Sequence, residues 1–469
     1  MKITVLGCGK SGYAAAKLAK RLGHEVFVSE SGSDEKYNKQ IDYFETEAID
    51  YELGGNTEKV LNCDLCVASP GIPPHAEVIK QLESNDIEII SEMEYAFRQL
   101  KGYKSLIAVT GTNGKTTTVN MIHHVLKSNG HKSLLCGNVG TPLSEYVGME
   151  EGALIVAEVS SYQLDRIVTF RPDIAIITNL SPDHLSYHGS YVEYFMAKWK
   201  ITSMQTDRDV LVLNDDDVLL GRSSSEAIKK LIKSSKYQLS DFSSSAQKAY
   251  FSLKQYKSEE YKGAYLDGEV IGVTSLDDIE ANSGGFMQTS QLPMPGSHNI
   301  ANSMAAILAC RYLELSDEDI RDAISSFSGV EHRIELVRSD NSIRWYNDSK
   351  ATNINATWYA LSSFKADVIW LAGGEGEGND YSELDSLVDE RVKEVICFGK
   401  EASNIFNHFS GKKKISIVED IEEAVIKAYR NAESGDTVLL SPACKSFDQF
   451  MNFEHRGEKF KRLVKEMYI

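Results

Sequence analysis

The feature that most constrains the fold is the segment Gly111-Thr-Asn-Gly-Lys-Thr-Thr-Thr118, which lies between a strand-like apolar stretch and the start of a helix. Small residues let backbone N–H groups approach phosphate oxygens, and the amino end of a helix favours negative charge. Lys115 can reach the outer phosphates and Thr116 can offer a hydroxyl to Mg²⁺. Val109 stands where the general pattern has its first glycine, so the loop is a shortened variant. The segment predicts a nucleoside-triphosphate site in an α/β sheet.

The chain is long enough for about three domains. A strand, glycine turn, helix and strand open it, and the pattern begins again near Lys104 with the phosphate loop. A third unit opens near Glu331. Because apolar strand-like and helical segments alternate, we expect mostly parallel sheets. The predicted α/β architecture has a Rossmann-like domain at residues 1–102, a central mostly parallel-sheet ATPase domain at 103–329 and a second Rossmann-like domain at 330–469.

Charge and apolar patterning exclude several classes of protein. Lys plus Arg number 50 and Asp plus Glu 68, so the net charge of 50 − 68 = −18 disfavours a general binder of nucleic acid or anionic membranes. No apolar run approaches the roughly 18 residues of a membrane helix, and the start of the chain does not read as a signal peptide. The seven scattered cysteines do not form a disulfide or zinc pattern. We expect a cytoplasmic protein with free thiols.

Two strand ends downstream of the phosphate loop carry groups that bind Mg²⁺. Glu158 ends the stretch ALIVAEV, and Asp183 and His184 follow AIITNL. Magnesium sites usually combine one or two protein groups with phosphates and water. A lone glutamate or histidine would more often be a core or surface residue, but their joint placement beside the loop favours a metal site.

Lys198 is the least ordinary lysine of the chain. In the helical stretch YVEYFMAKWKI it shares a face with Tyr191, Phe195 and Thr202, so it points inward with aromatic residues. Two interpretations stay open. The stem could pack while the ammonium reaches water, or a buried amine with a lowered pKa could be chemically modified.

The opening glycines match a nucleotide-binding pattern. Gly7-Cys-Gly-Lys-Ser-Gly12 has the spacing G-x-G-x-x-G, and Glu30 ends the next strand. The motif alone favours NAD or FAD, although the same turn can hold any diphosphate. The turn Ser69-Pro-Gly-Ile72 could share the ligand.

In the third unit, charged and hydroxyl residues cluster after predicted strands. Arg333, Asp348, Lys350 and Thr352 lie in two such loops, and Ser441-Pro-Ala-Cys-Lys-Ser446 follows another strand. Because ligands gather at the carboxyl ends of parallel strands, these loops could bind a phosphate or a carboxylate. Functionless surface charge is the alternative.

Taken in order, a set of segments resembles the Mur ligases over nearly the whole chain: GTNGKTTT, AEVSSYQLD, NLSPDH, GSHNIANSMAAI, HR, WYNDSKATN and SPACKSFDQFMNFEHRG. The two segments NDSKATN and SPACKSFDQFMNFEHRG are the most specific, and they match the members that add D-glutamate. The resemblance implies that the first domain binds a uridine diphosphate rather than NAD, the central domain ATP, and the third the amino acid.

The implied reaction is ATP-dependent amide formation in cytoplasmic peptidoglycan precursor synthesis. The alanyl carboxylate of UDP-N-acetylmuramoyl-L-alanine attacks the γ-phosphorus of ATP to form an acyl phosphate, and the D-glutamate amine then displaces phosphate. The expected cofactors are ATP, two Mg²⁺ ions and a carbamate on Lys198. The expected partners are these small molecules, with no nucleic acid or membrane, and we expect a monomer.

The resemblance also implies roles for individual residues. Catalysis falls to Lys115, Glu158, His184, Lys198 and Arg333, and metal binding to Thr116, Glu158, His184 and Lys198. ATP would contact Gly111, Thr112, Asn113, Gly114, Lys115, Thr116, Thr117, Thr118, Asn302, Arg333 and Asp348. The UDP substrate would contact Lys10, Ser11, Glu30, Ser31, Ser69, Pro70, Gly71, Asn138 and His184. D-Glutamate would contact Lys350, Thr352, Ser446, Phe447 and Phe453.

One position departs from the family pattern. Related enzymes commonly carry a basic residue for the D-glutamate carboxylate where this chain has Glu377, and a small residue where it has Lys445. Lys445 or Lys350 could supply the charge, the loop could align differently, or the amino-acid selectivity could differ. The alternatives for function are the same mechanism with another amino acid, a nucleotide-binding relative without ligase activity, and an NAD-linked oxidoreductase. We also expect domain closure about the segment 328–331.

Overall fold

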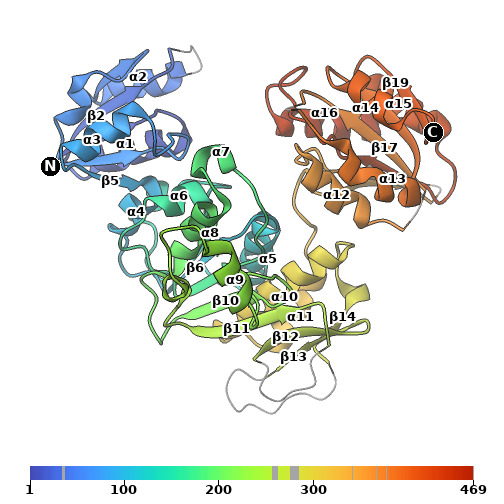
Figure 1. Cartoon of the computed structure of the whole chain (residues 1–469), viewed down its shortest axis with the longest axis horizontal. Coiled ribbons are helices and arrows are strands. Elements are labelled where there is room, and N and C mark those ends of the chain that lie inside the picture. The colour runs from blue at the N-terminus through green and yellow to red at the C-terminus, as the bar shows by residue number, and fades with distance from the viewer. Residues whose placement is uncertain are drawn as a thin grey trace. The chain divides into compact units, whose positions relative to one another are not determined.

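Three β-sheets form the framework of the chain in the computed structural model (Figure 1). The structure describes residues 1–33, 37–255, 262–274, 285–340, 342–365, 367–376 and 378–467. The chain divides into two compact units. Unit 1 comprises Met1–Gln291 and Ala301–Ser325, and unit 2 comprises Leu292–Ile300 and Ser326–Ile469.

The first sheet is parallel, in the order β3-β2-β1-β4-β5. Its strands are β1 (Lys2–Leu6), β2 (Glu25–Glu30), β3 (Asp50–Leu53), β4 (Leu65–Ala68) and β5 (Glu88–Ser91). Its helices are α1 (Lys10–Arg21), α2 (Asn38–Thr46), α3 (Glu77–Ser84) and α4 (Glu92–Phe97). The alanine-rich face of α1 is buried. The strand order reverses between β1 and β4, and such a switch point is where doubly wound sheets bind ligands.

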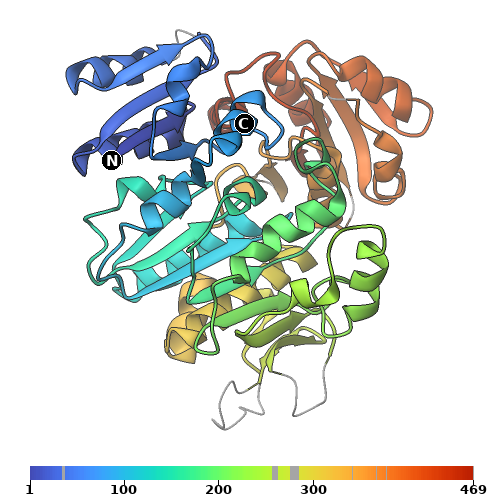
Figure 2. The same ribbon diagram turned by 60° about the vertical axis from the view of Figure 1, so that its left-hand side comes forward.

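The second sheet carries the phosphate loop and has the order β14-β13-β12-β11-β10-β9-β6-β8-β7. Its strands are parallel from β7 to β12 and run side by side in Figures 1 and 2. They are β6 (Ser105–Thr110), β7 (Ser133–Gly137), β8 (Leu154–Glu158), β9 (Ile174–Ile177), β10 (Val210–Asn214), β11 (Gln247–Ser252), β12 (Gly263–Asp267), β13 (Val270–Val273) and β14 (Met287–Gln288). The antiparallel strands β12 and β13 form a hairpin about the turn Asp267-Gly268.

The helices that follow the second sheet's strands are α5 (Lys115–Ser128), α6 (Ser161–Asp165), α7 (Leu185–His188), α8 (Tyr191–Trp199), α9 (Ser225–Ile232), α10 (Ser297–Tyr312) and α11 (Asp317–Ser325). The division between the units falls within α10. Every residue of β6 is buried, so this central strand fixes where the phosphate loop begins.

The third sheet lies in unit 2 and has the order β15-β16-β20-β17-β18-β19. Only the pair β15–β16 is antiparallel. The strands are β15 (Glu335–Asp340), β16 (Ile343–Asn347), β17 (Val368–Gly373), β18 (Val392–Phe398), β19 (Lys414–Ile417) and β20 (Thr437–Leu440). The helices are α12 (Ile354–Ser362), α13 (Asp385–Arg391), α14 (Ala402–Phe409), α15 (Ile421–Asn431) and α16 (Phe453–Glu466).

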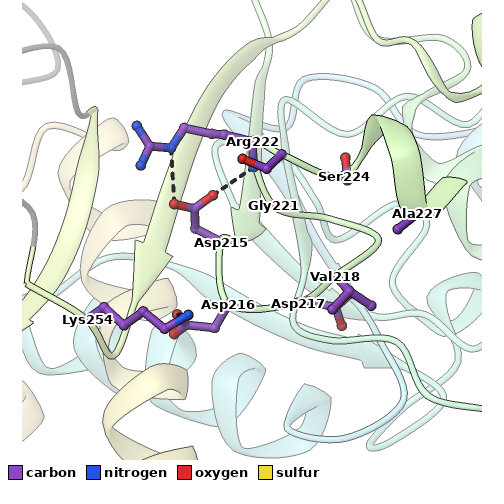
Figure 3. A pocket seen from close by; sticks show the side chains of 10 residues that line it. Asp215, Asp216, Asp217, Val218, Gly221, Arg222, Ser224, Ala227 and Lys254 are labelled. Atoms are coloured by element: carbon purple, nitrogen blue, oxygen red, sulfur yellow. Dashed lines mark hydrogen bonds and ion pairs between the residues drawn. The ribbon is translucent and has the colours of Figure 1, made fainter.

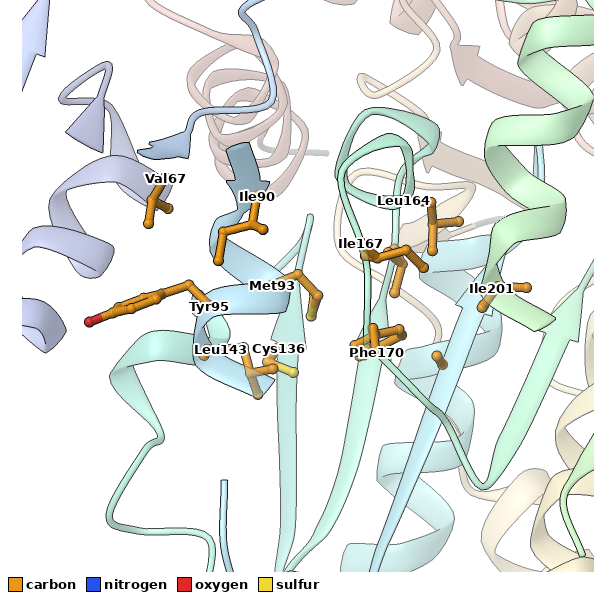
Figure 4. Packing of buried hydrophobic residues seen from close by; sticks show 14 of the residues in the cluster. Val67, Ile90, Met93, Tyr95, Cys136, Leu143, Leu164, Ile167, Phe170 and Ile201 are labelled. Atoms are coloured by element: carbon orange, nitrogen blue, oxygen red, sulfur yellow. The ribbon is translucent and has the colours of Figure 1, made fainter. Parts of the chain in front are cut away.

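The first two sheets share one buried core. Met93 and Tyr95 of α4 belong to the same apolar cluster as Leu143 and Phe170 of the following region (Figure 4). The buried Glu94 carboxylate accepts hydrogen bonds from the backbone N–H groups of residues 168–170. These contacts explain why the first two sheets form a single compact unit. The domain boundaries at 102/103 and 329/330 stay predictions.

The prediction that the cysteines are free thiols is confirmed. All seven cysteines are free thiols, and six of them are buried. Within the described ranges, no helix is both long enough and apolar enough to cross a membrane.

Candidate functional site

The phosphate loop joins β6 to α5 at the middle of the second sheet. Gly111 and Gly114 have φ values of +139° and +87°, a region that favours glycine. A Cβ atom at Gly111 would collide with Thr178 Oγ1, and one at Gly114 with Asn302 Oδ1. Glycine is therefore required twice, and Asn302 of α10 lies directly against the loop.

Residues at the end of β9 hold the loop in shape. The Thr112 N–H donates to the Asn179 carbonyl and the Asn113 N–H to Asn179 Oδ1, both at 2.9 Å. The Thr178 hydroxyl donates to the Asn113 carbonyl. The sequence analysis did not single out Thr178 and Asn179. The available signal was that Asn179 is the first residue of the NLSPDH segment and Thr178 directly precedes it.

Some basic and hydroxyl side chains of the phosphate loop contact the loop itself, and others are buried in the core. Lys115 Nζ donates to the carbonyls of Gly111 and Thr112 at 2.8 Å, so the ammonium lies over its own loop. Thr116 and Thr117 are buried. The N–H and hydroxyl of Thr118 both donate to the Gly114 carbonyl, so this side chain serves the first helical turn.

Lys198 on α8 is fully inside the protein, with 2% of its surface exposed. Its ammonium donates to the Gly111 carbonyl at 2.8 Å and lies 4.7 Å from the centre of the Tyr194 ring. The Tyr194 hydroxyl is 2.9 Å from Thr112 Oγ1. Burial, and then the charge of Lys115, hold the pKa of Lys198 well below its usual range. The predicted inward face is confirmed, and the ammonium does not reach water.

Glu158 ends β8 with 1% of its surface exposed. Its Oε1 accepts from Asn138 Nδ2 at 2.8 Å, and the Asn138 N–H donates to the Glu158 carbonyl. Oε2 is buried and has no hydrogen-bond partner within the described part of the chain. Buried carboxylate oxygens are nearly always paired, so this orphaned atom fits a bound cation.

His184 directly precedes α7 and has the left-handed conformation, with φ +52°. Its Nε2 lies 3.4 Å from Asp183 Oδ2, and its ring centre is 4.9 Å from that of Tyr162. Burial lowers the pKa of His184, and the charges of Lys198 and Lys115 lower it further against the opposing effect of Asp183. The imidazole is therefore neutral near pH 7, the form that ligates metals.

These groups meet at the carboxyl ends of β6, β8 and β9. Two lysines, two carboxylates and a neutral imidazole surround a loop built to accept phosphate. An orphaned carboxylate oxygen, a neutral imidazole and the Thr116 hydroxyl are the donor types that Mg²⁺ takes, so the residues present fit that ion.

A pocket of about 740 Å³ follows β10 in the same sheet (Figure 3). The Asp215 carboxylate accepts from the N–H and guanidinium of Arg222. The Asp216 carboxylate accepts from Ser252 Oγ and the Leu253 N–H, and that of Asp217 from the N–H groups of Leu180 and Leu219. The three carboxylates thus serve the surrounding loops. Asp217 fixes the segment that leads to His184.

The glycine turn after β1 lies at the switch point of the first sheet. Gly7 has φ +85°, and a Cβ at Gly12 would collide with the Gly7 carbonyl. Glu30 accepts from the N–H groups of Cys8 and Gly32 at 2.9 and 2.8 Å. Burial alone would raise the pKa of Glu30, but these hydrogen bonds outweigh it and lower the pKa. The Glu30 carboxylate therefore stabilises the glycine turn.

The other predicted residues of this edge lie close by. The Ser69 hydroxyl donates to the Gly7 carbonyl at 3.4 Å, and the Ile72 N–H closes the turn that holds Pro70 and Gly71. Lys10 Nζ donates to the Gly140 carbonyl, and the Ser31 hydroxyl reaches Glu30 at 3.5 Å. Ser11 lies in the first turn of α1. The two turns share the switch point.

Asp348 and Arg333 lie at the carboxyl edge of the third sheet. Asp348 is buried and accepts from the Ser441 hydroxyl at 2.8 Å and from the Ile334 N–H at 3.3 Å. Burial raises the pKa of Asp348 to about 7. Arg333 Nε is buried without a hydrogen-bond partner among the residues that the structure describes.

The predicted amino-acid residues share this edge. Lys350 Nζ lies 5.5 Å from the centre of the Phe453 ring, and the Thr352 N–H donates to the Lys350 carbonyl. Ser446 is buried, whereas 62% of Phe447 is exposed. Glu377 lies outside the described residues.

Two further residues join the loops of this edge. Lys445 pairs with Glu375 through hydrogen bonds in both directions between their backbones. Arg456, which the sequence analysis missed, is fully buried and donates to Ser349 after β16, to Gly373 at the end of β17 and to Cys444 after β20. One guanidinium therefore holds the carboxyl ends of three strands together.

Comparison with known proteins identifies the family. The models named MurD N-terminal domain, Mur ligase middle domain and Mur ligase, glutamate ligase domain match residues 2–78, 109–310 and 332–444. The UDP-N-acetylmuramoylalanine--D-glutamate ligase of Christiangramia forsetii is 39% identical over 99% of both chains. The protein of the same name from Cytophaga hutchinsonii is 38% identical over 99% of both. The chain belongs to the Mur ligase family.

Membership confirms the resemblance and the fold class predicted from the motifs. Among solved Mur ligases, the UDP-N-acetylmuramate-alanine ligase of Thermotoga maritima superposes with a TM-score of 0.58 at 19% identity over 99% of both chains. E. coli FolC, solved with DHPP and ADP, gives 0.55 at 16% identity over 80% of this chain and 92% of that one. At such identities the likeness concerns the fold.

Proposed function

We propose that this chain is the ATP-dependent ligase that joins D-glutamate to UDP-N-acetylmuramoyl-L-alanine, releasing ADP and phosphate in cytoplasmic peptidoglycan precursor synthesis. The observation that carries the proposal is the set of buried groups around the phosphate loop: Lys198 on the Gly111 carbonyl and Glu158 with an orphaned oxygen. The names of the full-length relatives support D-glutamate as the amino acid. A monomer is part of the proposal.

The phosphate loop and Lys115 hold ATP in this proposal. Backbone N–H groups near Gly114 and the amino end of α5 face the phosphates, and the lysine turns from its own carbonyls to the outer phosphates. Asn302 and Asp348 bind the nucleoside. Mg²⁺, held by Thr116, Glu158 and His184, supplies positive charge to a site where two anions must approach each other.

A carbamate on Lys198 would give a buried cation a chemical role. A neutral amine nitrogen attacks the carbon of CO₂ and loses one proton, which leaves an N-carboxylate. The low pKa of Lys198 supplies the neutral amine, and Glu158 and Asp183 lie near enough to influence its charge. The product is an anionic metal ligand in place of an ammonium.

The two other substrates bind at the other two sheets. The turns after β1 and β4 and the end of β2 offer Lys10, Ser11, Glu30, Ser31, Ser69, Pro70 and Gly71 to the uridine diphosphate, and Asn138 contacts the same substrate. The loops of unit 2 offer Lys350, Thr352, Ser446, Phe447 and Phe453 to D-glutamate. Lys445 supplies the positive charge that Glu377 does not.

The reaction needs charge neutralisation more than covalent chemistry by the protein. The alanyl carboxylate oxygen attacks the γ-phosphorus while the bond to the β-γ bridging oxygen breaks, and Lys115 and Arg333 stabilise the transferring group. The neutral amine of D-glutamate then attacks the acyl carbon, and phosphate leaves. An amide forms, and one proton goes to solvent.

The test is phosphate release from ATP with UDP-N-acetylmuramoyl-L-alanine and a panel of amino acids: D-glutamate, L-glutamate, L-lysine, glycine and none. The proposal predicts release that depends on D-glutamate. Release that depends on another amino acid would refute D-glutamate as the substrate but would leave the proposed mechanism in place. No release under any condition would favour a nucleotide-binding relative without ligase activity.

A further inference from the structure

A tight turn at residues 330–335 introduces the third sheet and carries Arg333. The Arg333 N–H donates to the Val330 carbonyl at 3.1 Å. His332 and Ile334 have φ values of +62° and +45°, and neither is glycine. A left-handed conformation costs such residues roughly 1–2 kcal/mol each, so the surroundings must hold the turn.

Lys461 of α16 is the group that holds it. Its ammonium lies 2.9 Å from Glu331 Oε1, 3.0 Å from Glu335 Oε1 and 3.1 Å from Glu458 Oε1. Only 11% of the lysine side chain is exposed. One cation therefore bonds to both ends of the turn and to its own helix.

The contact reaches the backbone of the turn through Glu335. The second oxygen of this carboxylate accepts from the His332 N–H at 2.9 Å and from Asn347 Nδ2 at 3.0 Å. The His332 carbonyl in turn accepts from the Lys350 N–H at 3.1 Å. The turn and the loop after β16 are thus tied together from one side by Lys461.

The charges leave no place for a metal ion instead. One ligand atom each from Glu331, His332 and Glu458 lies within 4.8 Å of the others. The ammonium of Lys461 already bonds to both of these glutamates. Burial alone would lower the pKa of Lys461, but the glutamates outweigh it and raise the pKa, so the lysine stays charged. Without it, three carboxylates would repel one another.

We propose that Lys461 is a positioning residue that fixes the 330–335 turn so that Arg333 meets the phosphates of ATP. The inference rests on the proposed function, which assigns Arg333 to the γ-phosphate. Arg333 Nε is buried and has no hydrogen-bond partner in the described ranges, so this nitrogen is not committed to another group of the fold.

A double-mutant cycle tests the proposal, with D-glutamate-dependent ADP release and calorimetric ATP binding as readouts. Lys461→Met should lower kcat/KM for ATP by about tenfold, and Lys461→Arg should stay within about threefold of the wild type. In the Arg333→Ala background, Lys461→Met should cause no further loss in activity or ATP binding. Lys459→Met is the matched control, because Lys459 lies on the same helix and pairs with Glu422 instead.

Two results would overturn the proposal. A loss of the same size in the Arg333→Ala background would mean that Lys461 acts on the whole unit, and a normal kcat/KM in Lys461→Met would mean that the turn holds itself. If Lys461→Met does not fold, Glu331→Gln takes its place, with an expected loss of about threefold and the same non-additivity. An inactive wild type that still binds ATP would refute the proposed ligation, while the binding arm of the cycle still tests Lys461.

Discussion

The Lys198 and Glu158 side chains at the phosphate site and the Lys400–Glu375 pair of unit 2 hold their charges in opposite ways. Lys198 and Glu158 are almost completely buried, and their partners are backbone carbonyls and an amide. In unit 2, Lys400 lies in the open, where it pairs with Glu375 at 3.2 Å. Removing the partner of a buried charge lowers the free energy of unfolding by several kcal/mol, whereas an exposed ion pair contributes only about 0–1 kcal/mol to it.

The comparison bears on the two positions where the sequence analysis expects a departure from the family pattern. Around the phosphate loop, Thr116, Glu158 and Lys198 are fixed by burial. The two expected departures, Glu377 and Lys445, both fall in unit 2; exposed charge in general can be exchanged at little expense in stability. We therefore expect substitutions of the buried residues at the phosphate site to abolish the reaction, and substitutions in the loops of unit 2 to shift the affinity for substrate.

The largest effect is expected at Lys198. Lys198→Ala should lower kcat by about 10³-fold, because the buried amine and any ligand formed on it are lost. Bicarbonate or a short carboxylic acid should restore part of the rate. Lys200→Ala is the control, since Lys200 lies two residues on and donates to the Asp165 carbonyl. Near-normal turnover of Lys198→Ala would refute the carbamate.

Glu158→Gln should lower kcat by about 10²-fold and shift the Mg²⁺ requirement to higher concentration, because the contact with Asn138 survives while the negative charge is lost. The measurement is kcat across a Mg²⁺ titration. Glu150→Gln changes another buried glutamate, one that accepts from the backbone N–H of Lys101, and should leave kcat unchanged. An unaltered Mg²⁺ profile for Glu158→Gln would remove the metal role.

Lys445→Ala should raise the KM for D-glutamate by about tenfold and change the KM for ATP little. The backbone pairing of Lys445 with Glu375 holds these two residues side by side. Lys400→Ala removes a neighbouring exposed cation and serves as the control. Equal effects of the two substitutions would indicate a non-specific electrostatic effect of positive charge. An unchanged KM in Lys445→Ala would mean that Lys445 does not bind D-glutamate.

The smallest effect is expected on stability at Asp348. Because the pKa of Asp348 is raised to about 7, the folded chain binds this proton more tightly than the unfolded chain. Its contribution is therefore full below about pH 4 and is lost as the pH rises through about 7. We expect the Tm of the wild type to fall between about pH 5.5 and pH 8. The Tm of Asp348→Asn should fall by a few degrees less over the same range. An exposed control, Asp389→Asn, should keep the wild-type slope, and equal slopes for all three would contradict the shift.

Local pattern predicted much of this molecule and could not predict the rest. The phosphate loop and the inward face of Lys198 follow from glycine spacing and helical periodicity, which neighbouring residues determine. Other features join residues that are far apart in sequence: the hydrogen bonds of Thr178 and Asn179 to the phosphate loop, the buried guanidinium of Arg456, and the charged cluster at Lys461. The shared core of the first two sheets also depends on long-range contacts, such as Glu94 with residues 168–170.

The central claim is that ATP activates the alanyl carboxylate as an acyl phosphate. Its most direct test uses UDP-N-acetylmuramoyl-L-alanine labelled with ¹⁸O in that carboxylate, with ATP, Mg²⁺ and D-glutamate, and mass spectrometry of the released phosphate. The account predicts one ¹⁸O atom in each phosphate and a product heavier by one D-glutamate residue. Phosphate without label alongside amide product would contradict it.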